Sequence, residues 1–253
     1  KAQANAKTSS LVQAGALLKL VDEFQNFGVA DICPWPTLGD LDLDQELHTR
    51  GTLFTRALEL AHQDLEARKN KIKLNSGKAV KNHFLISNYR HVNVASYGQT
   101  VKIKGDPNIQ PLAEFLNQEA FRFKSIRLDF NSSLTADLYD QFVALLTPDT
   151  KNKIECVEDP YPFDEARWKT SPLKLACDFE KAPQWPIKVQ KPVRAKVDAD
   201  ALYLTSAMDH PVGVIHGLIE AQKHENKVHG FMTLDQYEDS SFLKYFNIHH
   251  GDM

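Results

Sequence analysis

Five short segments in the middle of the chain share a pattern that restricts the fold, because each is apolar and carries a charged residue at its end. The two outer segments carry a lysine and the three inner ones carry an acid. In chain order these residues are Lys104, Asp129, Glu158, Asp178 and Lys191. Short apolar runs bounded by polar residues are typical of buried strands. One acid at a strand end is an ordinary turn residue, but five charged ends in series indicate strands whose ends meet at one place.

Strand-like runs and helical patterns alternate after about residue 81, which predicts a parallel sheet. The runs lie at residues 83–87, 100–104, 125–130, 153–158, 174–179, 187–191, 201–207 and 228–233. Helical patterns lie at residues 111–123, 135–146 and 212–224. Eight strands close an α/β fold of the TIM type, a (β/α) barrel. The stretch from Asp178 to Lys191 is too short for a strand and a full crossover helix, so either that barrel unit is degenerate and has lost its helix or the strand count is wrong there.

The opening third of the chain is organised differently, with strand patterns ahead of helical ones. Residues 28–33 are a strand candidate, and the proline-containing residues 34–39 form a rigid connection. Residues 52–68 then repeat apolar side chains near the helical period. We therefore expect an α+β region ahead of the barrel.

Charge and composition exclude several classes of function. With 30 basic and 33 acidic residues the formal net charge is −3, which gives no long-range attraction for nucleic acid or an acidic membrane. No apolar run is long enough to span a bilayer, and no leader pattern opens the sequence. The three scattered cysteines predict reduced thiols in a cytoplasmic protein. The composition is compatible with a monomer and leaves the oligomeric state open.

The charged strand ends have the chemistry of a metal-dependent site. Side chains alternate along a strand, so Lys102 and Lys104 share one face and would point into the barrel. Carboxylates from Asp129, Glu158 and Asp178 on three neighbouring strands suit Mg²⁺, which prefers oxygen ligands. A buried lysine beside a divalent cation becomes a usable base near neutral pH. A metal opposite that base can stabilise the enolate formed when a proton next to a carboxylate is removed.

As a set, these motifs resemble those of the enolase superfamily, in its muconate-lactonising branch. They are Lys-x-Lys at 102–104, Asp-x-Asn at 129–131, Val-Glu-Asp-Pro at 157–160, Asp178, and Lys-Pro at 191–192. Within that branch the chain is most similar to the o-succinylbenzoate synthases. The segments FGVADICPWPTLGD at 27–40 and LTSAMDHPVG at 204–213 carry this similarity.

The resemblance implies two domains and a reaction. A capping domain would comprise residues 1–76 with the C-terminal tail 232–253, and the barrel would comprise residues 77–231. The reaction would be the Mg²⁺-dependent dehydration of 2-succinyl-6-hydroxy-2,4-cyclohexadiene-1-carboxylate to 2-succinylbenzoate in menaquinone biosynthesis. The substrate is thus a small carboxylate, and the elimination of water would be syn, through an enediolate.

The same resemblance implies a role for each matching residue. The metal ligands would be Asp129, Glu158 and Asp178. The general base would be Lys104, and Lys191 on the opposite face would stabilise the enediolate. The substrate would contact Lys102, Asn131 and Ser206.

Other functions remain open from the sequence. An N-succinylamino-acid racemase or a dipeptide epimerase would use the same two lysines, which can act on either face of a substrate. Dipeptide epimerases tend to carry Asp-x-Asp on the eighth strand, and residues 228–235 contain none. A barrel that serves only as a binding module is the alternative of another class. The presence of all five charged groups disfavours it, since a degenerate site loses ligands or lysines.

Overall fold

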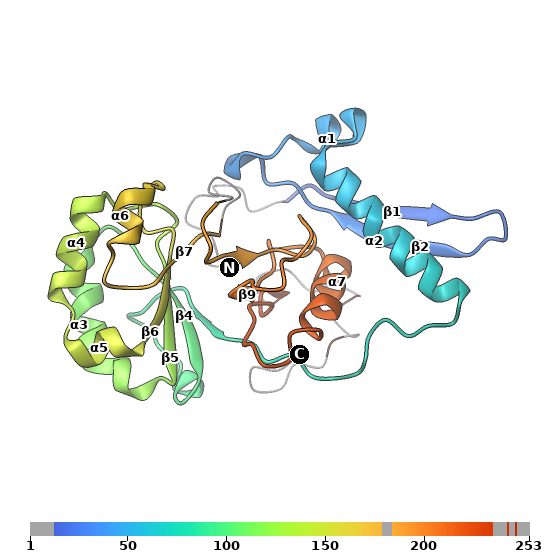
Figure 1. Cartoon of the computed structure of the whole chain (residues 1–253). Coiled ribbons are helices and arrows are strands. Elements are labelled where there is room, and N and C mark those ends of the chain that lie inside the picture. The colour runs from blue at the N-terminus through green and yellow to red at the C-terminus, as the bar shows by residue number, and fades with distance from the viewer. Residues whose placement is uncertain (1–12, 179–183, 235–241, 243–245, 247–253) are drawn as a thin grey trace. The chain divides into compact units, whose positions relative to one another are not determined.

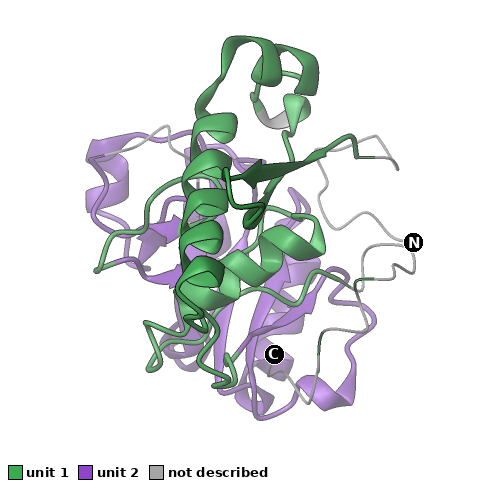
Figure 2. Ribbon diagram, turned by 90° about the vertical axis from the view of Figure 1, so that its right-hand side faces the viewer, with its two compact units in different colours: residues 1–81, 190–200, 204–253 green, residues 82–189, 201–203 purple. Residues whose placement is uncertain are grey.

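The computed structural model describes residues 13–178, 184–234, 242 and 246, and divides the chain into two compact units (Figures 1 and 2). Unit 1 comprises residues 1–81, 190–200 and 204–253, and unit 2 comprises residues 82–189 and 201–203. Most of the expected C-terminal tail, from residue 235 on, lies outside the described residues. Among the described helices, none is long and apolar enough to cross a membrane.

Unit 2 is built on a sheet of five parallel strands that pair in chain order. The strands are β3 (Phe84–Ile86), β4 (Thr100–Lys104), β5 (Ser125–Asp129), β6 (Ile154–Glu158) and β7 (Leu175–Ala176). All five fall within runs predicted from the sequence. Parallel strands in sequential order, each followed by a crossover, are the arrangement found in one side of a (β/α) barrel.

Four helices cover one face of this sheet (Figure 1). They are α3 (Ile109–Glu119), α4 (Ala136–Leu145), α5 (Pro148–Lys153) and α6 (Glu165–Lys169), and 3₁₀ turns lie at Val94–Ser96 and Ala120–Arg122. The side chains of Thr135, Thr147 and Asp164 cap α4, α5 and α6 by accepting a backbone N–H. Helices α5 and α6 are not among the predictions, because elements of six and five residues are too short to display a helical period.

Alternate residues of the strands face the helices and form the core of unit 2. Ile103, Leu128 and Val157 are fully buried there, together with Leu112 of α3 and Phe142 of α4. The side-chain period of two then turns the intervening strand residues to the other face of the sheet. The sheet thus places its charged side chains opposite its helix-packed face.

The remaining predicted barrel strands are short. Strands β8 (Val189–Gln190) and β9 (Tyr203–Leu204) form a two-stranded sheet, and each begins in unit 2 and ends in unit 1. In place of the predicted strand at 228–233, Gly230 forms only an isolated bridge to Thr205, and the N–H of His229 donates to the carbonyl of Lys81 at 2.7 Å. Residues 184–188 contain no helix, as expected for a degenerate unit, while residues 179–183 lie outside the described residues.

In its described residues, unit 1 combines a β-hairpin with three helices. The hairpin pairs β1 (Ala16–Val21) with β2 (Phe27–Ile32) antiparallel, and Asp22 closes its turn by accepting the N–H groups of Phe24 and Asn26 at 2.9 Å. The helices are α1 (Leu43–Thr49), α2 (Thr52–Lys69) and α7 (Pro211–Ala221), and a 3₁₀ turn lies at Pro36–Leu38. The predicted strand at 28–33 and helix at 52–68 correspond to β2 and α2.

Helix α2 lies against β2 at a distance that only glycine permits. A Cβ atom at Gly28 would stand 1.9 Å from the carbonyl oxygen of Ala61. Ala57, Leu60 and Ala61 of α2 are buried in the same cluster as Ala30 of β2. Small residues on both elements therefore allow the close approach that forms the core of unit 1.

A pair of buried carboxylates joins β2 to the segment before α7. Asp31 Oδ2 accepts the N–H of His210 at 2.8 Å, and Asp209 Oδ2 accepts the N–H of Ala207 and the hydroxyl of Ser206, both at 3.0 Å. Asp31 is 6% exposed and Asp209 is 2% exposed. Burial, and next the charge of Asp209, raise the pKa of Asp31 to about 7.

Asp31→Asn is expected to flatten the dependence of stability on pH. The folded pKa of Asp31 exceeds the usual 3.8, so its protonated form stabilises the fold below pH 4, and this stabilisation is lost as the pH rises through 7. The contribution of Asp31 to the free energy of unfolding falls by at most about 4 kcal/mol over this pH range. An asparagine cannot ionise, so urea unfolding should show a smaller fall in stability between pH 5 and pH 8.

The control for this measurement is Asp44→Asn, which changes an exposed acid of α1. The charge of Asp209 acts on Asp31. Arg194 is a further charged group of this region, since it acts on Cys33 together with Asp31 and Asp209. The wild-type pH dependence should persist in the control. An equal slope in Asp31→Asn and wild type would contradict the assignment to Asp31.

Candidate functional site

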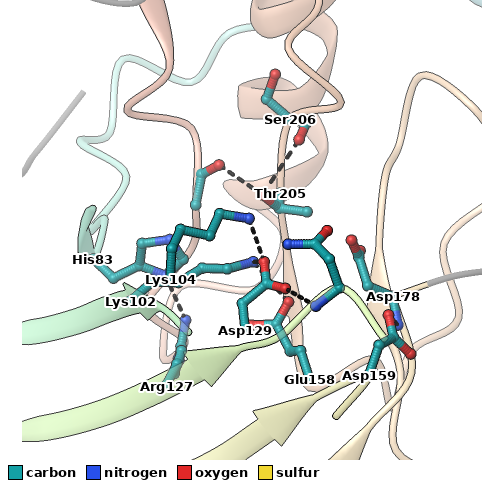
Figure 3. A network of polar contacts seen from close by, with 12 residues as sticks. His83, Lys102, Lys104, Arg127, Asp129, Glu158, Asp159, Asp178, Thr205 and Ser206 are labelled. Carbon is teal, nitrogen blue, oxygen red and sulfur yellow. Dashed lines mark hydrogen bonds and ion pairs between the residues drawn. The ribbon is translucent and has the colours of Figure 1, made fainter. Parts of the chain in front are cut away.

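The register of the unit 2 sheet gathers the charged strand ends at one edge. Lys104 of β4 lies beside Asp129 of β5, and Asp129 lies beside Glu158 of β6. Figure 3 shows Lys102, Lys104, Asp129 and Glu158 converging at the carboxyl ends of these strands. The sequence prediction that these four side chains meet is therefore supported by the strand pairing.

The lysines and carboxylates form a compact, buried ion cluster. Lys102 Nζ lies 2.9 Å from Asp129 Oδ2 and 2.6 Å from Glu158 Oε2. Lys104 Nζ lies 2.5 Å from the same oxygen of Asp129. The side chains of Lys102 and Glu158 are 8% and 0% exposed, whereas that of Lys104 is 22% exposed. Lys104 is thus the lysine of the pair that a molecule arriving from solvent can reach.

Burial and neighbouring charges act against each other on these groups. Burial opposes the charge of Lys102, but Asp129 and Glu158 outweigh it and raise the pKa of that lysine. Burial likewise opposes the charge of Asp129, but Lys102 and Lys104 outweigh it and lower the pKa of that carboxyl. For Glu158 burial dominates and, with the charges of Asp129 and Asp178, raises its pKa despite Lys102. Lys102 is therefore held as a cation by its carboxylate neighbours.

Two further acids stand at the same edge. Asp159 Oδ2 accepts the backbone N–H of Asp178 at 3.2 Å. The pKa of Asp159 is raised to about 8. Burial is the largest cause, and the negative charges of Asp178, Asp129 and Glu158 raise it further. Asp159 is not among the predicted site residues, although it directly follows Glu158. The edge thus holds more acid than its two lysines balance.

The backbone at this edge adopts unusual conformations. Asn131, Ser132 and Asp159 have φ values of 50°, 57° and 38°, in the left-handed region that disfavours side-chain-bearing residues. The N–H of Ser132 donates to the carbonyl of Asp159 at 2.6 Å, and the N–H of Asn131 donates to Asp129 Oδ1 at 3.1 Å. Strained residues of this kind are concentrated at functional sites. Here they tie the end of β5 to the end of β6.

Tyr203 of β9 is a member of the cluster that the sequence patterns did not reveal. Its hydroxyl donates to Glu158 Oε1, and its ring lies 3.9 Å from the guanidinium carbon of Arg127. Burial and Glu158 raise the pKa of Tyr203, so the phenol keeps its proton. A tyrosine in a short apolar run gives no periodic signal of such a contact.

Comparison with known proteins identifies the family. Residues 1–67 match the family model described as the N-terminal domain of O-succinylbenzoate synthase. Over 264 aligned positions the chain is 31% identical to the o-succinylbenzoate synthase of Bdellovibrio bacteriovorus, covering 91% of this chain and 80% of that protein. This chain belongs to the o-succinylbenzoate synthase family. The resemblance inferred from the strand-end motifs is therefore confirmed.

Solved structures of the superfamily share the fold of this family member. The o-succinylbenzoate synthase of Thermosynechococcus elongatus, crystallised with Mg in its active site, aligns with a TM-score of 0.65 at 17% identity and covers 90% of this chain and 87% of that one. A mandelate racemase/muconate lactonizing protein from Herpetosiphon aurantiacus aligns with a TM-score of 0.69 at 13% identity, over 90% and 85%. The predicted fold class, a (β/α) barrel with a capping domain, is confirmed.

Two of the predicted site residues belong to unit 1. Lys191 directly follows β8, where its carbonyl oxygen accepts the N–H groups of Arg194 at 2.9 Å and Ala195 at 3.2 Å. Ser206 follows β9, and its hydroxyl donates to Asp209. Each is held in a turn of its own unit, and the proximity of these two residues to the carboxylate cluster stays a prediction.

The donor set at the carboxylate edge fits Mg²⁺ in its chemistry. Asp129, Glu158 and Asp178 offer hard oxygen ligands on consecutive strands. Within the described part of the chain, no three His, Cys, Asp or Glu side chains stand together as a ready ligand set. The ammonium groups of Lys102 and Lys104 contact oxygens of Asp129 and Glu158. The excess of acid over lysine is the feature that favours a divalent cation here.

Proposed function

We propose that this family member catalyses the synthesis of 2-succinylbenzoate from 2-succinyl-6-hydroxy-2,4-cyclohexadiene-1-carboxylate by syn elimination of water. The observation that carries the proposal is the buried cluster of Lys102, Lys104, Asp129 and Glu158 in a chain of this family. Proton abstraction next to a carboxylate requires a base and a positive charge that stabilises the enediolate, and this cluster offers a lysine together with carboxylates that could hold a divalent cation.

Lys104 would act as the base and then as the acid. Its Nζ takes the proton from the ring carbon that bears the carboxylate, and the electron pair moves into that carboxylate as an enediolate. The carbon–oxygen bond to the ring hydroxyl then breaks, and Lys104 returns the proton so that water leaves. The ring becomes aromatic. The partial exposure of Lys104, at 22%, supports this role over that of Lys102.

Asp129, Glu158 and Asp178 would hold Mg²⁺, whose charge would stabilise the negative charge that develops on the substrate carboxylate. Lys102 would hydrogen-bond the substrate carboxylate once its ammonium group has left Asp129 and Glu158. Asn131 would orient the lysine side of the site. A magnesium requirement is so far supported by the family and by the acidic donor set.

The remaining predicted residues would complete the site from unit 1. Lys191 would stabilise the enediolate from the opposite face by a cation–π contact with the ring. Ser206 would contact the succinyl end of the substrate. Residues 1–76 with 232–253 would form the cap and residues 77–231 the barrel, and the three free cysteines suit a cytoplasmic enzyme.

The direct test is formation of 2-succinylbenzoate from its cyclohexadiene precursor with and without Mg²⁺. We expect turnover with Mg²⁺ and its loss with a chelator, because the carboxylates then lack the cation that stabilises the enediolate. The appearance of the aromatic product is followed by absorbance and confirmed by mass.

A racemase would give a different result in the same preparation. No turnover of the precursor, together with exchange of the α-proton of N-succinylamino acids in heavy water, would replace the synthase by the racemase. Absence of both reactions, with metal bound, would overturn both assignments and leave a site for another carboxylate substrate.

A further inference from the structure

We propose that Tyr203 is a positioning residue for Glu158, which fixes one carboxylate oxygen so that the other is presented to the metal. The inference rests on the proposed function, because it concerns how Glu158 serves the expected Mg²⁺. It assigns a role to a residue outside the motifs that identify the family site.

The two oxygens of Glu158 have different partners. Oε1 accepts the hydroxyl of Tyr203, and Oε2 accepts Lys102 Nζ at 2.6 Å. Lys102 Nζ also lies 2.9 Å from Asp129 Oδ2. Because the two oxygens share this lysine, Oε2 is the oxygen of Glu158 that faces Asp129, another proposed metal ligand. The Glu158 side chain is fully buried. Its orientation is therefore decided by these two donors.

The two donors respond differently to a cation. The ammonium of Lys102 carries a positive charge, so a divalent ion at Oε2 would repel it. The hydroxyl of Tyr203 donates to Oε1 and carries no charge for the ion to repel, so it can stay at Oε1 while the ion binds. Lys102 thus acts as an exchangeable partner of Glu158 and Tyr203 as a permanent one.

The ring of Tyr203 is itself held in place. Arg127 lies over one face with its guanidinium carbon 3.9 Å from the ring centroid, and His83 meets the ring edge-to-face at 5.5 Å and 84°. Arg127 donates to Glu155 through two nitrogens, at 3.0 and 2.9 Å, and lies 3.0 Å from His83 Nδ1. Figure 3 shows the contact between Arg127 and His83. The contacts of both residues with the ring leave the hydroxyl of Tyr203 little freedom to leave Glu158.

The test is the affinity for Mn²⁺, used as a spectroscopic substitute for Mg²⁺. Free Mn²⁺ is measured by electron paramagnetic resonance during titration of wild-type protein and Tyr203→Phe, with Mg²⁺ competition to locate the ion. Loss of a hydrogen bond to a metal ligand typically weakens metal binding about 10- to 100-fold. We expect an increase of that size in the Kd for Mn²⁺ of Tyr203→Phe.

Tyr139→Phe is the matched control. Tyr139 is also fully buried in unit 2, but its hydroxyl contacts Ser171 at 2.7 Å. Its substitution should leave the Kd for Mn²⁺ unchanged, and urea unfolding in chelator reports how each variant affects folding alone.

Three outcomes would overturn the inference. An unchanged Kd in Tyr203→Phe would remove the positioning role and leave the proposed function intact. Equal weakening in both variants would assign the effect to general destabilisation. Absence of Mn²⁺ binding by the wild type would contradict the proposed metal site itself, and the inference with it.

Discussion

Lys104→Ala is expected to lower kcat for 2-succinylbenzoate formation by about 10⁴-fold, the upper end of the contribution of general acid–base catalysis. The effect is large because the same nitrogen removes the proton and returns it to the leaving hydroxyl. Product formation under saturating Mg²⁺ measures it. Exchange of the substrate α-proton in heavy water should be lost in parallel.

Lys104→Arg separates the role of the base from that of the charge. Arginine keeps the ion pair with Asp129, which lies 2.5 Å from Lys104 Nζ in the wild type, but a guanidinium does not deprotonate in proteins. This variant should fold and bind metal yet remain inactive. Lys174→Ala, an exposed lysine beside β7, should retain full activity. More than a tenth of wild-type turnover in Lys104→Arg would exclude Lys104 as the base.

Lys102→Met is expected to destabilise the metal-free protein by about 3–5 kcal/mol, the usual effect of leaving buried charges without their partner. Asp129 and Glu158 both contact this ammonium, and all three side chains are at least nine-tenths buried. Asp129 keeps its ion pair with Lys104 in the variant, so the loss falls mainly on Glu158. Added Mg²⁺ should restore part of the loss by supplying the missing positive charge, so its stabilising effect should exceed that in the wild type. Urea unfolding in chelator and in Mg²⁺ measures both quantities.

Lys169→Met provides the comparison for this variant. Lys169 pairs with Glu165 at 2.6 Å, but the two side chains are 64% and 50% exposed. Exposed pairs contribute about 0–1 kcal/mol, and Mg²⁺ should make no difference to this variant. If Lys102→Met were as mild as Lys169→Met, the buried cluster would not hold the ionic form described above.

The sequence predicted the part of the site that depends on strand ends and alternation. Lys102 and Lys104 share a face because the strand period is two, and parallel pairing aligns Lys104 with Asp129 and Asp129 with Glu158. These relations follow from local pattern and strand order. The five-stranded sheet was predictable for the same reason.

The contacts that the sequence did not predict join residues far apart in the chain. Tyr203 reaches Glu158 across 45 positions, and no spacing rule links them. Asn131 and Asp159 adopt left-handed conformations, which asparagine and aspartate tolerate better than most residues, but the hydrogen bond from Ser132 to Asp159 that joins these two loops has no local signal in the sequence. Lys191 and Ser206 remain predictions, because they belong to the other compact unit.

The discontinuity of unit 1 has a consequence for synthesis of the chain. The sheet of unit 2 pairs neighbours in sequence and needs no residue beyond 176, so its contacts are local and close early. Strand β2 is synthesised before the strands of that sheet. His210, whose N–H donates to Asp31 of β2, is synthesised after them. During synthesis, the carboxylate of Asp31 therefore lacks this hydrogen-bond donor until His210 has been added to the chain. An early-made part of this protein is among the last to be completed.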